Sequence, residues 1–204
     1  MSEEPAPTDI KPLTKTRLEA FSDGVVAIII TIMVLELKVP EGVEWHDLRE
    51  SIHVFLLYAF SFIYIGIYWN NHHHLLHVVK SINGGVLWAN MHLLFWLSLV
   101  PFTTRWMGES YHDGTLGQVP VAIYGLSLLM PGIAYSILVQ LLIAANGRDS
   151  LIKKAIGKDS KGIISVVVYA IGIGLTFWSV WAGVACYVAV ALMWLVPDRR
   201  IERS

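Results

Sequence analysis

Charged side chains are scarce in this sequence of 204 residues, since Asp, Glu, Lys and Arg make up only 15% of it. Soluble domains usually contain about 25%. Long stretches carry no charge at all, and 55% of the residues are apolar. This composition is typical of a chain whose solvent is lipid. A formal net charge of −1, with no basic stripe, also argues against nucleic acid as a partner.

Cysteine is nearly absent, and motifs of enzyme chemistry are missing. Cys186 is the single cysteine, so it cannot form a disulfide within the chain, and its apolar surroundings predict a small packed residue. The sequence has no nucleotide-binding loop and no Gly-x-Ser-x-Gly motif. It has no ligand set for haem or zinc apart from a run of histidines considered below. We therefore predict neither enzymatic activity nor a cofactor.

A cleavable signal peptide and an internal repeat are also lacking. No small-residue cleavage site follows the first apolar segment, so we expect that segment to stay in the protein. The preceding residues 1–15 are polar and contain proline, which predicts a disordered cytoplasmic tail. Residues 16–198 would then form a single membrane domain, and residues 199–204 a second cytoplasmic tail.

Apolar runs long enough to cross a bilayer make up most of the chain. A helix needs about 20 apolar residues to cross the hydrocarbon layer. The last run is too long for one crossing and just long enough for two. The sequence therefore predicts an all-α integral membrane protein with six transmembrane helices. They are expected at residues 18–37, 52–79, 86–107, 119–145 and in the two parts of 162–196, divided near 177–181.

Basic residues are distributed unevenly between the two sides that six crossings define. Only Lys38, Arg49 and Arg105 fall on the side opposite the termini. The positive-inside rule therefore places both termini in the cytoplasm, with membrane lipids as partners. We interpret residues 153–161 as a plain basic loop rather than a lipid-binding helix. The residues on the cytoplasmic side are Lys11, Lys15, Arg17, Lys80, Arg148, Lys153, Lys154, Lys158, Lys161, Arg199, Arg200 and Arg203.

Polar residues inside the expected spans are candidates for function, because burying them in lipid is costly. Asp23 lies about a turn and a half into the first span and needs a partner within the protein. Polar side chains of the second and third spans lie at a similar depth. Pro101 is expected to kink the third span near its outer side. We predict one cluster of four polar residues: Asp23, His72, Asn90 and His92.

One narrow face of the first span is apolar. At 100° per residue, Ile28, Thr31, Ile32 and Leu35 lie on one stripe, and Asp23 lies almost opposite. Periodicity alone favours the simple interpretation that this stripe contacts lipid or a neighbouring helix.

The second span ends in a run of histidines. His73 and His77 have the i, i+4 spacing of some metal ligands. Histidines also suit the C-terminus of a helix because of its dipole, and no Cys or carboxylate cluster lies nearby in the sequence. We therefore predict no metal site.

The start of the first span resembles the signature of the transmembrane-protein-175 potassium channels. The resemblance extends to the end of the second span, to the third span and to residues 194–200, so it covers nearly the whole chain. The animal members are endosomal and lysosomal, and the bacterial relatives are shorter. The residues that carry the resemblance are Arg17, Phe21, Ser22, Asp23, Trp69, His72, Asn90, Pro101, Phe102 and Thr103.

The resemblance implies an assembly and a pore. Animal members have two six-span repeats and work as dimers, so this single-repeat chain resembles the bacterial type, which is a homotetramer. The resemblance therefore also implies a bacterial-type plasma membrane. The first span of each subunit would line the pore, with Ile28, Ile32 and Leu35 at the constriction and Thr31 beside it. The histidine run contains more histidines than the family pattern requires, so we assign no role to His73, His74 and His77. The implied structural network consists of Arg17, Phe21, Ser22, Asp23, Trp69, His72 and Asn90.

Selectivity would have to come from this constriction. The common potassium channels use a Thr-Val-Gly-Tyr-Gly carbonyl filter, and this sequence has none. At an apolar ring, potassium loses less than sodium on partial dehydration, so we expect a potassium-permeable channel of modest selectivity. One alternative is a secondary transporter of a cation or proton that uses Asp23 and the histidines as a relay, although the repeat and broken helices of such transporters are missing. A histidine-based membrane metalloprotein is another.

Overall fold

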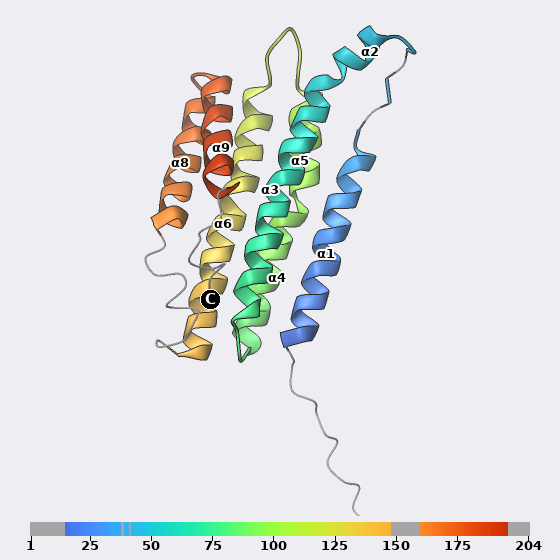
Figure 1. The fold of residues 1–204 in the computed structure, drawn as a ribbon. Coiled ribbons are helices and arrows are strands. Elements are labelled where there is room, and N and C mark those ends of the chain that lie inside the picture. Colours follow the sequence, from blue (N-terminus) through green and yellow to red (C-terminus); the bar gives the residue numbers. More distant parts are fainter. Residues whose placement is uncertain (1–14, 38, 41, 148–159, 196–204) are drawn as a thin grey trace, which may run out of the picture.

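The computed structural model describes residues 15–37, 39–40, 42–147 and 160–195. These residues form an all-helical bundle (Figure 1). The two predicted tails lie outside the described residues except for Lys15, which begins the first helix. Most of the basic segment 153–161 lies outside them as well. The helices are α1 Lys15–Leu35, α2 Trp45–Glu50, α3 Ile52–His77, α4 Gly84–Ser98, α5 Val100–Glu109, α6 Gln118–Asn146, α8 Ser160–Thr176 and α9 Val180–Leu195.

Four helical segments are long and apolar enough to cross a membrane: α1, α3, the α4–α5 pair and α6. Helices α8 and α9 have 17 and 16 residues, which corresponds to about 25 Å at 1.5 Å per residue. Within the described residues, that length is slightly less than the hydrocarbon core of about 30 Å. The division expected near 177–181 falls between Thr176 and Val180, as predicted. The all-helical membrane fold is confirmed, and the count of six crossings stays a prediction.

The third span is interrupted at Leu99. Pro101 has no N–H to donate to the carbonyl four residues earlier, and its ring crowds the preceding turn. The Leu99 N–H instead donates to the carbonyl of Trp96 at 3.2 Å, three residues back. Pro101 then lies in the first turn of α5, where a missing N–H costs little. The expected distortion is therefore present two residues before the proline.

Helices α8 and α9 pack closely through small residues. A Cβ at Gly172 would lie 2.8 Å from the Cβ of Cys186, and a Cβ at Gly183 would lie 2.9 Å from the Gly172 carbonyl oxygen. Such small residues allow helix backbones to approach in lipid. Cys186 is half-buried in this contact, which agrees with the packing role expected for it.

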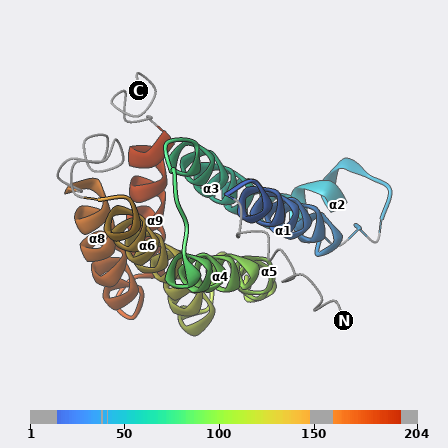
Figure 2. The same cartoon turned by 90° about the horizontal axis from the view of Figure 1, so that it is seen from below.

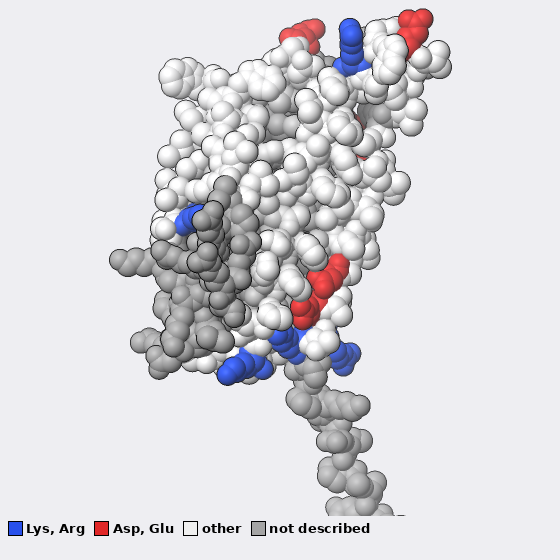
Figure 3. Space-filling view, viewed as in Figure 1, with Lys and Arg blue, Asp and Glu red and all other residues white. Residues whose placement is uncertain are grey.

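Helix α1 lies at one edge of the bundle, whereas α8 and α9 lie at the opposite edge (Figure 2). It packs against α3, α4 and α5. On the face shown in Figure 3, most charged side chains gather at the two ends of the bundle and leave a broad uncharged band between them. This distribution suits a bundle whose middle is surrounded by lipid.

Candidate ion pathway

The two sides of α1 have different surroundings. One side is buried against the neighbouring helices at intervals of three and four residues. On the other side, Ile28 is 58% exposed, Ile32 43% and Leu35 79%. An apolar face that a single subunit leaves open must be covered by lipid or by another subunit. The buried side consists of Leu18, Ser22, Val26, Ile29 and Met33.

Thr31 lies on the exposed side with these residues. Its hydroxyl donates to the carbonyl oxygens of Ala27 and Ile28, both at 3.0 Å. Threonine hydroxyls in membrane helices commonly bond to their own backbone in this way. The hydroxyl hydrogen is thus used within the helix, while the oxygen keeps lone pairs that can face a cation. A contact between Thr31 and a passing ion stays a prediction.

A chain of hydrogen bonds joins α1, α4 and α3 on the buried side. The Asn90 amide donates to Ser22 Oγ at 2.8 Å, and Asn90 Oδ1 lies 2.8 Å from His72 Nε2. The Ser22 hydroxyl in turn donates a hydrogen bond to the Leu18 carbonyl oxygen at 2.8 Å. Asn90 is fully buried, and Ser22 and His72 nearly so. The side-chain amide of Asn90 therefore links α4 to both α1 and α3.

Asp23 bonds to Trp69, a member of the network that the resemblance implied, and not to the other residues of the expected four-residue cluster. Its Oδ1 accepts a hydrogen bond from Trp69 Nε1 at 3.0 Å, one turn before His72 on α3. His92 also lies apart, because its Nε2 accepts from Trp96 Nε1 at 2.8 Å on its own helix. Residues two positions apart on a helix point to nearly opposite sides, so Asn90 and His92 face different neighbours. The prediction of a single cluster of four polar residues is therefore wrong.

Arg17 and Phe21 lie outside these hydrogen-bonded groups. Arg17 is exposed, and its side chain makes no hydrogen bond or ion pair within the part of the chain that the structure describes. Phe21 is 50% exposed. Neither side chain contributes to the contacts of α1 within one subunit in the way that Ser22 and Asp23 do. The place of Arg17 and Phe21 in the structural network stays a prediction.

The histidine run contacts the start of α1. His73 Nδ1 lies 3.5 Å from Glu19 Oε1, and its ring stacks on Trp69 with centroids 5.9 Å apart. Lys15 Nζ donates to the His77 carbonyl oxygen at 2.8 Å, which satisfies an otherwise open acceptor at the end of α3. Among the described residues, no group of three or more His, Cys, Asp or Glu side chains is arranged to hold a metal ion.

A group of buried hydroxyls was missed by the sequence reasoning. Ser61 Oγ lies 2.7 Å from both Thr104 Oγ1 and Tyr124 Oη, and Thr103 Oγ1 lies 2.8 Å from Ser127 Oγ. These bonds join α3 and α5 to α6. Hydroxyl residues in apolar spans commonly bond across helices, and that tendency was the signal available in the sequence.

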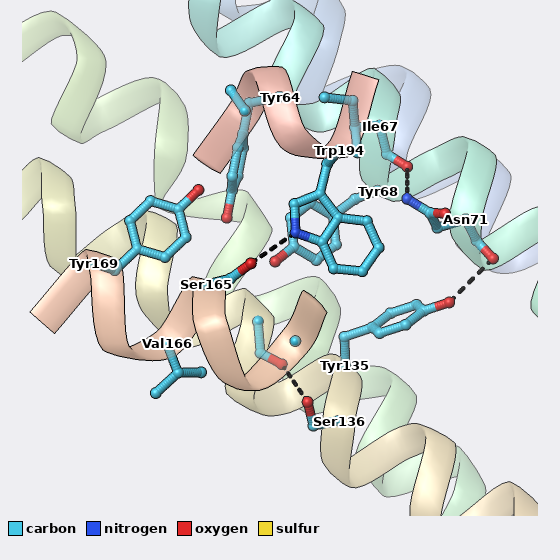
Figure 4. Close-up of a pocket in the computed structure, with 13 residues that line it drawn as sticks. Tyr64, Ile67, Tyr68, Asn71, Tyr135, Ser136, Ser165, Val166, Tyr169 and Trp194 are labelled. Carbon is cyan, nitrogen blue, oxygen red and sulfur yellow. Dashed lines mark hydrogen bonds between the residues drawn. The ribbon is translucent and has the colours of Figure 1, made fainter. Parts of the chain in front are cut away.

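A small cavity lies within the subunit, behind α3 as seen from α1. Aromatic rings from α3, α6, α8 and α9 surround it, and Trp194 Nε1 donates there to Ser165 Oγ at 2.8 Å (Figure 4). It leaves only about 50 Å³ for the centres of water-sized molecules. Because α3 separates the cavity from the exposed face of α1, it does not extend that face into a pathway. The rings are Tyr64, Tyr68, Tyr135, Tyr169 and Trp194.

Comparisons with known proteins agree with this architecture. The family model for the endosomal/lysosomal potassium channel TMEM175 matches residues 17–101. A protein named as a potassium channel from Chryseobacterium sp. (strain P1-3) is 55% identical over 192 residues, which are 94% of this chain and 98% of that protein. The human endosomal/lysosomal proton channel TMEM175 is 35% identical over 98 residues, 42% of this chain and 19% of that protein.

A solved structure extends the likeness to the fold. The crystal structure of a lysosomal potassium-selective channel TMEM175 homolog from Chamaesiphon minutus superposes with a TM-score of 0.74 at 30% identity, covering 89% of this chain and 96% of that one. Fold and relatives together define a multi-pass helical membrane channel rather than an enzyme. The chain belongs to the TMEM175 family of cation channels.

Proposed function

We propose that four copies of this chain form a potassium-permeable channel in which α1 of each copy lines the pore. The observation that carries the proposal is the exposed apolar side of α1, with Ile28, Ile32 and Leu35 uncovered in the single subunit. One narrow helix face cannot enclose an ion pathway, but four copies around an axis can. The names of the bacterial relatives support potassium as the permeant ion.

The spacing of the exposed residues sets the shape of the constriction. Ile28 and Leu35 are seven residues apart, about 10 Å along a helix at 1.5 Å per residue. An ion in such an apolar ring keeps only part of its hydration shell. The larger potassium ion holds its water less tightly than sodium, and dehydration at the ring therefore favours potassium. The oxygen of Thr31 lies between the levels of Ile28 and Ile32 and replaces part of the lost hydration.

The polar contacts of α1 set its rotation. Ser22 and Asp23 are held from α4 and α3 through Asn90 and Trp69. Because these contacts lie on the side of α1 away from Ile28, they keep the apolar stripe directed toward the axis. Residues 16–198 form the channel domain of each subunit. Both termini lie in the cytoplasm, as the distribution of basic residues favours. The likeness to bacterial channels supports the plasma membrane as the location.

The decisive experiment changes the constriction and measures selectivity in reconstituted channels. Ile28→Asn places a polar side chain in the apolar ring, so it should raise sodium permeability relative to potassium. Val34→Asn is the matched control, because Val34 is 47% exposed on the same helix but lies about 120° from Ile28 in projection. The measurement is the bi-ionic reversal potential of single channels.

Two outcomes would count against the proposal. An unchanged reversal potential in both Ile28→Asn and Leu35→Asn would mean that α1 does not line the pore. Fluxes at transporter rates, without unitary currents, would favour the secondary-transporter alternative instead. The proton permeability should be measured in the same recordings, because the human relative is named as a proton channel.

A further inference from the structure

Arg105 connects α5 to the residue that follows α1. Its Nη1 donates to Glu36 Oε2 at 2.7 Å, and its Nε donates to Glu109 Oε1 at 3.2 Å. Glu36 comes directly after Leu35, the most exposed residue of the apolar stripe. The Arg105 side chain is 48% exposed and that of Glu36 is 30% exposed. The ion pair therefore lies at the surface, at the end of α1 remote from Arg17.

The ion pair and the apolar stripe share one open groove between α1 and α5. Ile28 and Ile32 line its apolar part, and Glu36 and Arg105 line its charged part. Four copies of α1 around an axis would bring four such pairs to one rim of the pore. The charge of Glu36 at that rim is balanced by Arg105 at hydrogen-bonding distance.

We propose that Arg105 sets the conductance of the channel by neutralising Glu36 at the rim next to Leu35. This inference rests on the proposed function, because it requires α1 to line the pore. Charges at the mouth of a pathway change the local concentration of the permeant ion. With Arg105 present, one guanidinium offsets part of the charge of two carboxylates, Glu36 and Glu109. Without it, the uncompensated Glu36 and Glu109 carboxylates of the four subunits attract cations to the entrance.

The test compares two single variants that change the rim charge in opposite directions. Arg105→Gln leaves Glu36 unbalanced and should raise the single-channel potassium conductance about two- to five-fold at low salt, as electrostatic focusing allows. Glu36→Gln removes one of the two carboxylates paired with Arg105, so the rim becomes less negative and the conductance should fall. The double variant should lie close to the unmodified channel. Arg49→Gln is the matched control, since it removes the same charge from an exposed position on α2, whereas Glu36 is paired with Arg105.

Ionic strength supplies a second readout. The Debye length falls from about 30 Å at 0.01 M salt to about 3 Å at 1 M. The difference between Arg105→Gln and the unmodified channel should therefore vanish in concentrated potassium chloride. A structural change in the pore would persist at all salt concentrations.

Several results would overturn the inference. If both single variants change the conductance in the same direction, the pair merely holds α5 against the end of α1. An unchanged conductance in Arg105→Gln, or an equal change in Arg49→Gln, would also contradict it. Ile28→Asn in the same experiment separates the two proposals. If Ile28→Asn alters the selectivity but Arg105→Gln leaves the conductance unchanged, only the proposed role of Arg105 is refuted. If neither Ile28→Asn nor Leu35→Asn alters the selectivity, the assignment of α1 to the pore is refuted.

Discussion

Asn90 offers the sharpest test of how α1 is held in place. Asn90→Ala removes its two hydrogen bonds, to Ser22 on α1 and to His72 on α3, each 2.8 Å long. The side chain is fully buried, so no water replaces it without entering the bundle. Hydrogen bonds between membrane helices contribute about 0.6 kcal/mol on average and at most about 1.7. Leaving His72 unpaired in the core adds about 1–3 kcal/mol.

The expected loss of stability for Asn90→Ala is therefore about 2–4 kcal/mol, from the sum of these terms. The free energy of unfolding would be measured by reversible denaturation in mixed detergent micelles. A double-mutant cycle of Asn90→Ala with His72→Ala should show coupling of about 0.6–1.7 kcal/mol. His92→Ala is the matched control. It lies two residues along α4 and bonds to Trp96, and its effect should add to that of His72→Ala.

Additive effects of Asn90→Ala and His72→Ala, within about 0.5 kcal/mol, would contradict this prediction, since that is the usual limit for independent sites. Coupling of His92→Ala to His72→Ala as strong as that of Asn90→Ala would contradict it as well. Either result would mean that the chain from Ser22 to His72 does not act as a unit.

Two further predictions concern α1. Asp23→Ala removes the acceptor of Trp69 Nε1 and should reduce the tetramer peak in size-exclusion chromatography without changing the selectivity of the surviving channels. A normal tetramer whose flux has a changed pH dependence would refute this role and favour a proton relay. Thr31→Val preserves shape but removes the hydroxyl oxygen from the exposed side, and should lower the ratio of potassium to sodium permeability. Unaltered selectivity in Thr31→Val would exclude Thr31 from the ion pathway.

The sequence alone determined the elements that depend on local properties. Hydrophobic length is counted along the chain, so the long spans and the turn before Val180 were predicted close to their observed positions. The effect of Pro101 is equally local. It predicted a kink in the third span, and the structure places an interruption of the helix at Leu99. The separation of Ile28 and Asp23 onto different sides of α1 followed from the helical period.

The partners of the polar residues were decided only by the tertiary structure. Asp23 and Trp69 are separated by 46 residues, and Ser22 and Asn90 by 68. Depth in the membrane suggested which polar groups lie at one level, but not which way each points. His92 was misplaced for this reason, because its direction depends on the rotation of α4 against α1 and α3. Helix rotation results from the packing of whole faces, and no local pattern in the chain encodes it.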